Sequence, residues 1–201
     1  MAQVKFTKSE LRSQQLRLGQ LNRYLPTLQL KKAMLQTEVN AAAAEALELT
    51  ERYHEEKKEA EVFQSLLSSD DTIDLLDALE IVDVVKEYES IAGVEIPHFK
   101  KVIFTEAKYS LFDHPFWFDD ALVFLRGLIS SKEKVHVVLE KKKLLEQELR
   151  EVSIRVNLFE KIMIPRTLEN IKKIKVFLGD QQLAAISQAK VAKRKILERA
   201  L

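Results

Sequence analysis

Residues 18–53 read LGQLNRYLPTLQLKKAMLQTEVNAAAAEALELTERY, and this stretch carries the clearest structural pattern in the chain. Ten of the eleven positions that recur alternately three and four residues apart are apolar, with Lys32 as the exception. A repeat sustained over five heptads is typical of a coiled-coil seam and predicts a long helix packed along another helix. The series comprises Leu18, Leu21, Leu25, Leu28, Lys32, Leu35, Val39, Ala42, Ala46, Leu49 and Tyr53.

The C-terminal half carries a second seam of the same kind. Its first part comprises Leu145, Leu149, Val152, Val156, Phe159 and Met163. The register slips at Pro165, and the seam is expected to resume as Ile164, Leu168, Ile171, Ile174 and Leu178, followed by Ala185, Ala189, Ala192 and Ile196. Alanine at seam positions lets two helix backbones approach closely, so we expect a thin paired end.

Two long helices separated by a compact segment predict an antiparallel two-helix coiled-coil hairpin made by one chain. In this prediction residues 1–67 form the N-terminal helix, residues 68–120 a compact middle region and residues 121–201 the C-terminal helix. The expected fold class is all-α, because four Gly and four Pro in 201 residues are too few for a protein of strands and turns. Association of two chains through the same seams is the structural alternative.

The middle region has a different character. Residues from Asp74 onward favour a short helix, whereas residues 94–99 and 101–104, near Gly93, favour β-structure. The compact insert is therefore expected to hold short helices, with a small β-hairpin as a further element. Aromatic residues gather towards its end and either close a small core or present an apolar patch to a partner: Phe112, Phe116, Trp117 and Phe118.

Both ends of the chain are basic. Residues 1–40 hold seven Lys and Arg against two Glu, and residues 161–201 hold ten against three acidic residues. Because the net charge of the whole chain is only +1, the middle is acidic. A hairpin brings the two basic segments to one end, and such a charge distribution favours different partners at its two ends.

The chain lacks the motifs of an enzyme or a metal protein. Its four Gly are isolated and begin no phosphate-binding loop, its four His have no metal-ligand spacing, and it has no Cys. We therefore expect no catalytic residue, metal or cofactor. No apolar run approaches the roughly 20 residues that span a bilayer, and no nucleic-acid-binding pattern of interleaved aromatic and basic residues occurs. The expected location is cytoplasmic, with any attachment to a membrane made through partner proteins.

The stretch RVNLFEKIMIPR at residues 155–166 resembles a pattern of the D subunits of the V-type and archaeal-type rotary ATPases, RVNALE followed by three residues and IPR. Weaker similarities follow the family order along nearly the whole chain: FTKSEL at 6–11, LKKAML at 30–35, GVEIP at 93–97 and YSLF at 109–112. The chain departs from the family at Phe6, where the family has proline, and at Pro26, where it usually has a helix former.

This resemblance implies a central rotor shaft that couples ATP hydrolysis or synthesis in a catalytic hexamer to ion translocation through a membrane ring. The implied partners are the catalytic A and B subunits, the F subunit of the stalk and the membrane-ring adaptor, which is the C or d subunit. The residues expected to face the hexamer cavity are Arg12, Arg17, Lys190, Lys193, Arg194 and Lys195. The residues expected along the shaft are Arg155, Asn157, Pro165 and Arg166, and the aromatic residues named above form the expected patch at the base. Asn157 either fixes helix register beside the seam or points to water.

A homodimeric scaffold or membrane-curving coiled coil is the alternative function, because it would share the long seams and the basic clusters. The direction of ATP turnover and the choice between protons and sodium ions belong to the membrane ring and the ion gradient rather than to the shaft.

Overall fold

A computed structural model describes residues 5–61, 79–106 and 117–199 of the chain. Its elements are helix α1 (Lys8–Ala60), strands β1 (Ile81–Ile91) and β2 (Val94–Phe104), helix α3 (Phe118–Leu158), the π-helix η2 (Phe159–Met163) and helix α4 (Ile164–Arg199). They form two compact units: unit 1 holds Met1–Lys31 and Glu151–Leu201, and unit 2 holds Lys32–Arg150. The mostly helical architecture and the small β-hairpin are confirmed.

The start of α1 is fixed by a local cap. The Thr7 hydroxyl oxygen accepts a hydrogen bond from the Glu10 amide at 3.2 Å, and the Leu11 amide donates to the Thr7 carbonyl at 3.0 Å. Thr7 therefore satisfies a backbone donor that the first turn leaves without a helical partner. From this cap α1 continues as a helix through Pro26, which is exposed and has no amide hydrogen to donate.

The seams account for most of the buried helical residues of the two units. In unit 1, Leu21 from α1 and Val152, Val156, Ile171 and Ile174 from the C-terminal helices are buried. In unit 2 the buried helical residues include Leu35, Val39, Ala42 and Ala46 on α1 and Val137, Val138 and Leu145 on α3. Every one of the eleven N-terminal seam positions is buried or half-buried, so the coiled-coil prediction for residues 18–53 is confirmed.

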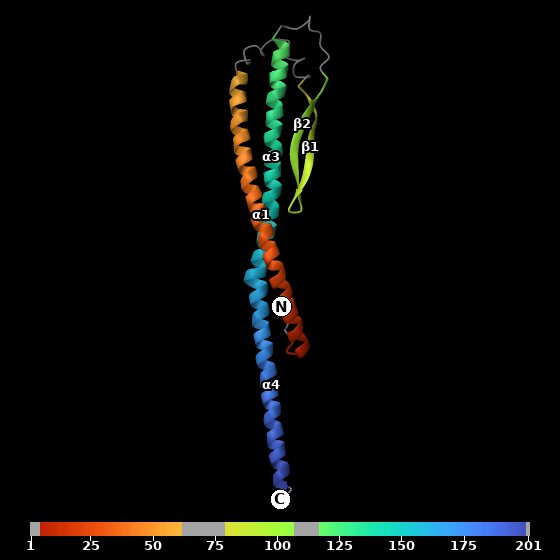
Figure 1. The fold of residues 1–201 in the computed structure, drawn as a ribbon, viewed down its shortest axis with the longest axis vertical. Helices are drawn as coiled ribbons and strands as arrows, with labels where there is room; N and C mark the ends of the chain where they lie inside the picture. The colour runs from red at the N-terminus through yellow and green to blue at the C-terminus, as the bar shows by residue number, and fades with distance from the viewer. Residues whose placement is uncertain (1–4, 62–78, 107–116, 200–201) are drawn as a thin grey trace. The chain divides into compact units, whose positions relative to one another are not determined.

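In unit 2, α1 and α3 run in opposite directions side by side (Figure 1). Lys141 on α3 donates a hydrogen bond to Glu45 on α1 at 3.2 Å, and only 11% of the Lys141 side chain is exposed. The two residues are 96 positions apart, so the pair ties the distant stretches of the chain together.

The β-hairpin in unit 2 is built around a two-residue turn. Ala92 and Gly93 have φ angles of 52° and 79°, and two positive φ values mark the turn type that matches the twist of paired strands. Residues 94–99 and 101–104 form one strand, β2, and its antiparallel partner is β1. β1 follows residues that the sequence favoured as a short helix, of which residues 74–78 lie outside the described part. Ile81, Val82 and the pair Val84–Val85 explain the strand, because β-branched residues favour a pleated surface.

Candidate partner-binding surfaces

The far end of α4, residues 181–199, is exposed throughout. The ring of Phe6, just before α1, lies 5.0 Å from the ring of Phe177 on α4, and the groove beside this contact has a volume of about 550 Å³. α1 therefore starts opposite Phe177, and α4 continues past it with no other described element of unit 1 beside it (Figure 1). The predicted pairing of Ala185, Ala189, Ala192 and Ile196 is wrong, because the first helix starts too late in the chain to reach them.

This exposed end, which we call the α4 tip, mixes positive charge with apolar side chains. Lys190, Lys193, Arg194 and Lys195 are all exposed, and Arg194 forms an ion pair with Glu198 at 3.6 Å. Solvent screens such a surface pair, so it does not neutralise the cluster. Large apolar side chains are exposed along the same segment: Leu183, Ile186, Val191, Ile196 and Leu197. A surface of this composition suits contact with a protein that carries acidic and apolar groups.

Arg12 and Arg17 are also exposed, but the structure does not bring them to the α4 tip. Both lie on the paired part of α1, which runs from the Phe6–Phe177 contact towards the middle of the chain. Lys190 lies 13 residues beyond Phe177, which is roughly 20 Å along a helix in the other direction. The predicted set of basic residues is therefore divided into two surfaces of unit 1.

The four predicted shaft residues are all exposed. Arg155 donates a hydrogen bond to Glu151 at 3.0 Å one turn earlier, and Asn157 faces solvent rather than the seam. The exposure of Asn157 favours the alternative that its side chain points to water over the alternative that it fixes the helix register. Pro165 and Arg166 lie in the first turn of α4, just after η2, where the Ile164 amide donates to the Phe159 carbonyl five residues earlier. The family-like stretch thus coincides with an irregular turn.

An exposed charge pair lines the groove beside Phe6 and Phe177. Lys173 and Glu169 are 2.6 Å apart on one face of α4. The hydrogen bond from Lys173 lowers the pKa of the Glu169 carboxyl below its ordinary value, and the positive charge of Lys173 contributes a smaller effect in the same direction. Because both side chains are well exposed, this pair is a surface feature and not a buried site.

The predicted aromatic patch is only partly described. Phe118 is 1% exposed and belongs to the core of unit 2, which favours the core alternative for this residue. Trp117 is half-buried, with its ring 6.5 Å from that of Phe118. Phe112 and Phe116 lie outside the described residues.

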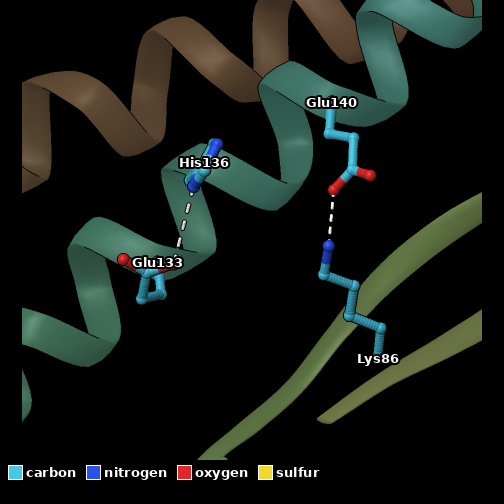
Figure 2. A network of polar contacts seen from close by, with 4 residues as sticks. All are labelled: Lys86, Glu133, His136 and Glu140. Carbon is cyan, nitrogen blue, oxygen red and sulfur yellow. Dashed lines mark hydrogen bonds and ion pairs between the residues drawn. The ribbon is translucent and has the colours of Figure 1, made fainter. Parts of the chain in front are cut away.

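The β-hairpin is held against α3 by polar contacts that the sequence did not reveal. Figure 2 shows Lys86 on β1 extending to Glu140 on α3, with 2.6 Å between Nζ and Oε2. This hydrogen bond raises the pKa of Lys86 above its ordinary value, against the opposing effect of burial. On the same helix, His136 and Glu133 lie 3.6 Å apart.

A second contact holds the end of β2. The Arg126 guanidinium on α3 donates to the Thr105 carbonyl at 3.0 Å and lies 5.2 Å from the centre of the Phe104 ring. Arg126 and Thr105 are 21 residues apart in the chain, so no local pattern could have paired them. The contacts of Lys86 with Glu140 and of Arg126 with Thr105 hold the hairpin against α3, so the two elements form a continuous surface of unit 2.

The residues described by the structure contain no cluster of His, Cys, Asp and Glu that could hold a metal ion. No helix among them is both long and apolar enough to cross a membrane.

Comparison with known proteins gives a consistent result over almost the whole chain. The family model described as the D subunit of ATP synthase matches residues 10–194. A protein of Chlamydia abortus, named as the D subunit of a V-type ATP synthase, is 44% identical over 199 residues, which cover 98% of this chain and 96% of the relative. Proteins with the same name from Chlamydia pneumoniae and Chlamydia trachomatis serovar L2 are 43% identical over 195 residues and 42% identical over 196 residues. These matches cover 96% and 97% of this chain, and 93% and 97% of the relatives.

Proposed function

The chain belongs to the D-subunit family of ATP synthases and is a central-stalk component of a rotary V-type ATPase. From this premise we propose that it is the rotor shaft that couples ATP turnover in a catalytic hexamer to ion translocation through a membrane ring. The main support for the proposal is the 44% identity to a D subunit over 199 residues. The seam positions, which are buried or half-buried within the single chain, support it as well.

In this proposal the α4 tip lies inside the ring of catalytic A and B subunits. Beyond Phe177 the shaft is a single helix, and the spacing of Lys190, Lys193 and Arg194 puts positive charge on one side of it, so the proposed asymmetry of the tip is one of charge. An asymmetric shaft cannot fit three surrounding interfaces in the same way, so each orientation favours a different state at each interface. Rotation and nucleotide turnover are then coupled mechanically, and the shaft itself carries no catalytic group.

Unit 2 is the proposed base of the shaft. Its hairpin and α3 form the surface expected to bind the F subunit of the stalk and, through the C or d adaptor, the membrane ring. The ion pair of Lys86 with Glu140 and the contact of Arg126 with Thr105 support this role, because a base that transmits torque needs elements held at fixed positions. The proposed location is peripheral to the membrane.

The alternative, a homodimeric scaffold, is not favoured. A coiled-coil dimer needs an exposed seam on each chain. All eleven positions of the N-terminal seam are instead buried or half-buried within one chain. The exposed apolar residues of the α4 tip lie beyond that seam and belong to the proposed contact with the catalytic ring.

The experiment is reconstitution with defined subunits. The purified chain is mixed with the F subunit and its mass is measured in the native state, then it is added to A–B hexamers and membrane rings in vesicles. We expect a 1:1 complex with the F subunit and restoration of ATP-driven ion pumping. A homodimer that binds lipid vesicles and does not bind the F subunit would overturn the proposal.

A further inference from the structure

Both strands of the hairpin in unit 2 are edge strands, because the sheet has only two strands. The pairing of Lys86–Ile91 on β1 with Val94–Phe99 on β2 is regular, and the two irregularities of the ladder lie before Lys86. Along this regular part, each strand has a row of backbone amides and carbonyls that point away from its partner. The two rows differ in what they offer to a further strand.

The turn determines which groups of β1 point outwards. Ile91 and Val94 flank the two-residue turn, so the carbonyl and amide that close the turn make them a hydrogen-bonded pair. Hydrogen-bonded and non-hydrogen-bonded pairs alternate along an antiparallel ladder, so Ser90 and Tyr88 belong to non-hydrogen-bonded pairs. The amides of Ser90 and Tyr88 therefore point away from β2, and the partner of Tyr88 in the ladder is Pro97.

Pro97 distinguishes the edge of β2 from that of β1. It has no amide hydrogen, so the outer row of β2 lacks a donor there, and the ladder to β1 needs none at this position. The side chains of Pro97 and of the neighbouring Ile96 are fully buried. On β1, by contrast, every residue from Glu87 to Ser90 is exposed. Within the described part of unit 2, β1 therefore has the more accessible edge and the more complete row of donors.

The side chains along this edge indicate which strand fits it. Glu87 and Glu89 lie on one face, where Lys100 and His98 of β2 approach them at 3.6 and 3.3 Å. Both carboxyl side chains remain well exposed, at 69% and 64%, so they are also accessible to cations on an added strand. On the other face, Tyr88 is 64% exposed and offers an apolar ring.

A second copy of β1 does not fit this edge. Antiparallel pairing of two copies about Tyr88 would set Glu87 of one chain against Glu89 of the other, and like charges directly opposite each other destabilise a sheet. The acidic edge instead favours a strand with Lys or Arg at alternate positions.

We propose that the β1 edge from Lys86 to Ser90 is a docking site for an extended segment of a stalk partner, which adds to the hairpin as a third strand. Lys or Arg side chains of this segment face Glu87 and Glu89, and an apolar side chain covers Tyr88. The contact of Lys86 with Glu140 holds the edge in place on α3. The inference rests on the proposed function, in which the hairpin and α3 form the partner-binding surface of the base.

Amide hydrogen exchange at single-residue resolution tests the docking site, in the chain alone and in the reconstituted ATPase. In the chain alone, we expect the amides of Tyr88 and Ser90 to exchange roughly tenfold faster than those of Glu87 and Glu89, which donate to β2. In the assembled ATPase, the amides of Tyr88 and Ser90 should slow roughly tenfold or more, whereas those of Glu87 and Glu89 change little. Slow exchange of Tyr88 and Ser90 already in the chain alone, or no slowing on assembly, would overturn the proposal.

Ser90→Pro removes one outward donor and leaves the bonds to β2 in place, as Pro97 does on the other strand. Ser90→Ala keeps the donor and is the matched control. In the assembled ATPase, Ser90→Pro should make the slowing at Tyr88 about fivefold smaller, and Ser90→Ala should leave it unchanged. The Glu89 amide reports whether the hairpin stays paired in each variant. Equal slowing in the two variants, with the Glu89 amide protected in both, would contradict strand addition.

A charge variant tests the same edge without any change in the backbone. Glu87→Gln with Glu89→Gln should reduce the slowing at Tyr88 by about fivefold in the assembled ATPase. Glu51→Gln with Glu55→Gln, on exposed residues of α1 in unit 2, makes the same change in net charge and should have no effect. The same result for both pairs would show that the acidic edge does not select the partner.

Failure of the docking site is distinguishable from failure of the proposed function. If the native chain restores ion pumping while the amides of Tyr88 and Ser90 exchange as in the chain alone, only strand addition is refuted. If the native chain does not restore pumping, the rotor function itself is refuted.

Discussion

The rings of Phe6 and Phe177 meet at 5.0 Å with their planes 40° apart, and this contact marks where the paired part of unit 1 ends. On one side of it α1 covers α4, and on the other side α4 is exposed up to Arg199. Phe6 therefore contacts α4 at the free end of the first helix.

Replacement of Phe6 by Ala should remove this contact. Phe6 and Phe177 remain 45% and 39% exposed, so we expect a loss of about 1 kcal/mol rather than the larger value of a core aromatic. Hydrogen exchange should rise in the first turns of α1 and remain unchanged in unit 2. Phe6→Leu, which keeps an apolar side chain, serves as the control. Equal protection of α1 in the native chain and in Phe6→Ala would show that the contact does not hold the helix.

The seam itself is tested by two leucines of α1 with opposite exposure. Leu35 is fully buried and Leu30 is 62% exposed. Leu35→Ala should lower the free energy of unfolding by about 3 kcal/mol, because it removes buried methyl groups and leaves a cavity. Leu30→Ala should change it by no more than about 0.5 kcal/mol. Urea unfolding measures both, and equal effects would contradict the assignment of the seam.

The contact of Lys86 with Glu140 predicts a pH-dependent contribution to stability. Because its partner raises the pKa of Lys86 in the folded state, the contribution is complete below the unfolded pKa of about 10.4 and is lost as the pH rises through the folded pKa. Glu140 is 43% exposed, so solvent screening limits the expected value to about 0.5–1 kcal/mol.

The measurement is the difference in unfolding free energy between the native chain and Lys86→Met from pH 7 to 11. We expect a constant difference up to about pH 10 and a smaller one above it. Glu140→Gln should show the same loss, and the double variant should lose little more than either single variant. A difference that grows with pH would mean that the ion pair does not stabilise the folded state.

Charge reversal at the α4 tip should impair coupling without unfolding the chain. Lys193 and Arg194 are exposed, and no other helix in the described part of unit 1 covers them, so Lys193→Glu with Arg194→Glu should leave Tm nearly unchanged. In the reconstituted ATPase we expect the ions pumped per ATP to fall roughly twofold or more, since like charges would oppose the proposed acidic lining of the ring. Lys132→Glu with Lys134→Glu makes the same change in charge on exposed residues of unit 2. If both double variants pump as many ions per ATP as the native chain, the positive charge of the α4 tip does not contribute to coupling.

The long helices could be predicted from the sequence because their signal is local and repeated. The spacing of Leu18, Leu35 and Tyr53 along one face is a property of the sequence alone, and the structure confirms it. The seam beyond Met163 was predicted one position wrong at Leu168. The slip near Pro165 was predicted, but a repeat analysis does not show how the helix accommodates it, and after the π turn Thr167 rather than Leu168 is buried.

The rest depends on contacts between distant residues. β1 could not be paired with β2 in advance because the two positive φ values at Ala92 and Gly93 carry a weak sequence signal, with Ala in one of the two positions. The attachment of Lys86 to Glu140 bridges 54 residues and follows from the docking of the hairpin. The exposure of the α4 tip likewise depends on where α1 begins relative to α4.

The central claim is that this chain turns inside a stationary ring, and a rotation measurement tests it most directly. The chain contains no Cys, so Val123→Cys, at a position that is 72% exposed, introduces a single thiol for a bead or rod. With the A–B hexamer fixed to a surface and ATP supplied, we predict continuous rotation of the probe in one direction. A probe that stays still while the same complexes hydrolyse ATP would contradict the account.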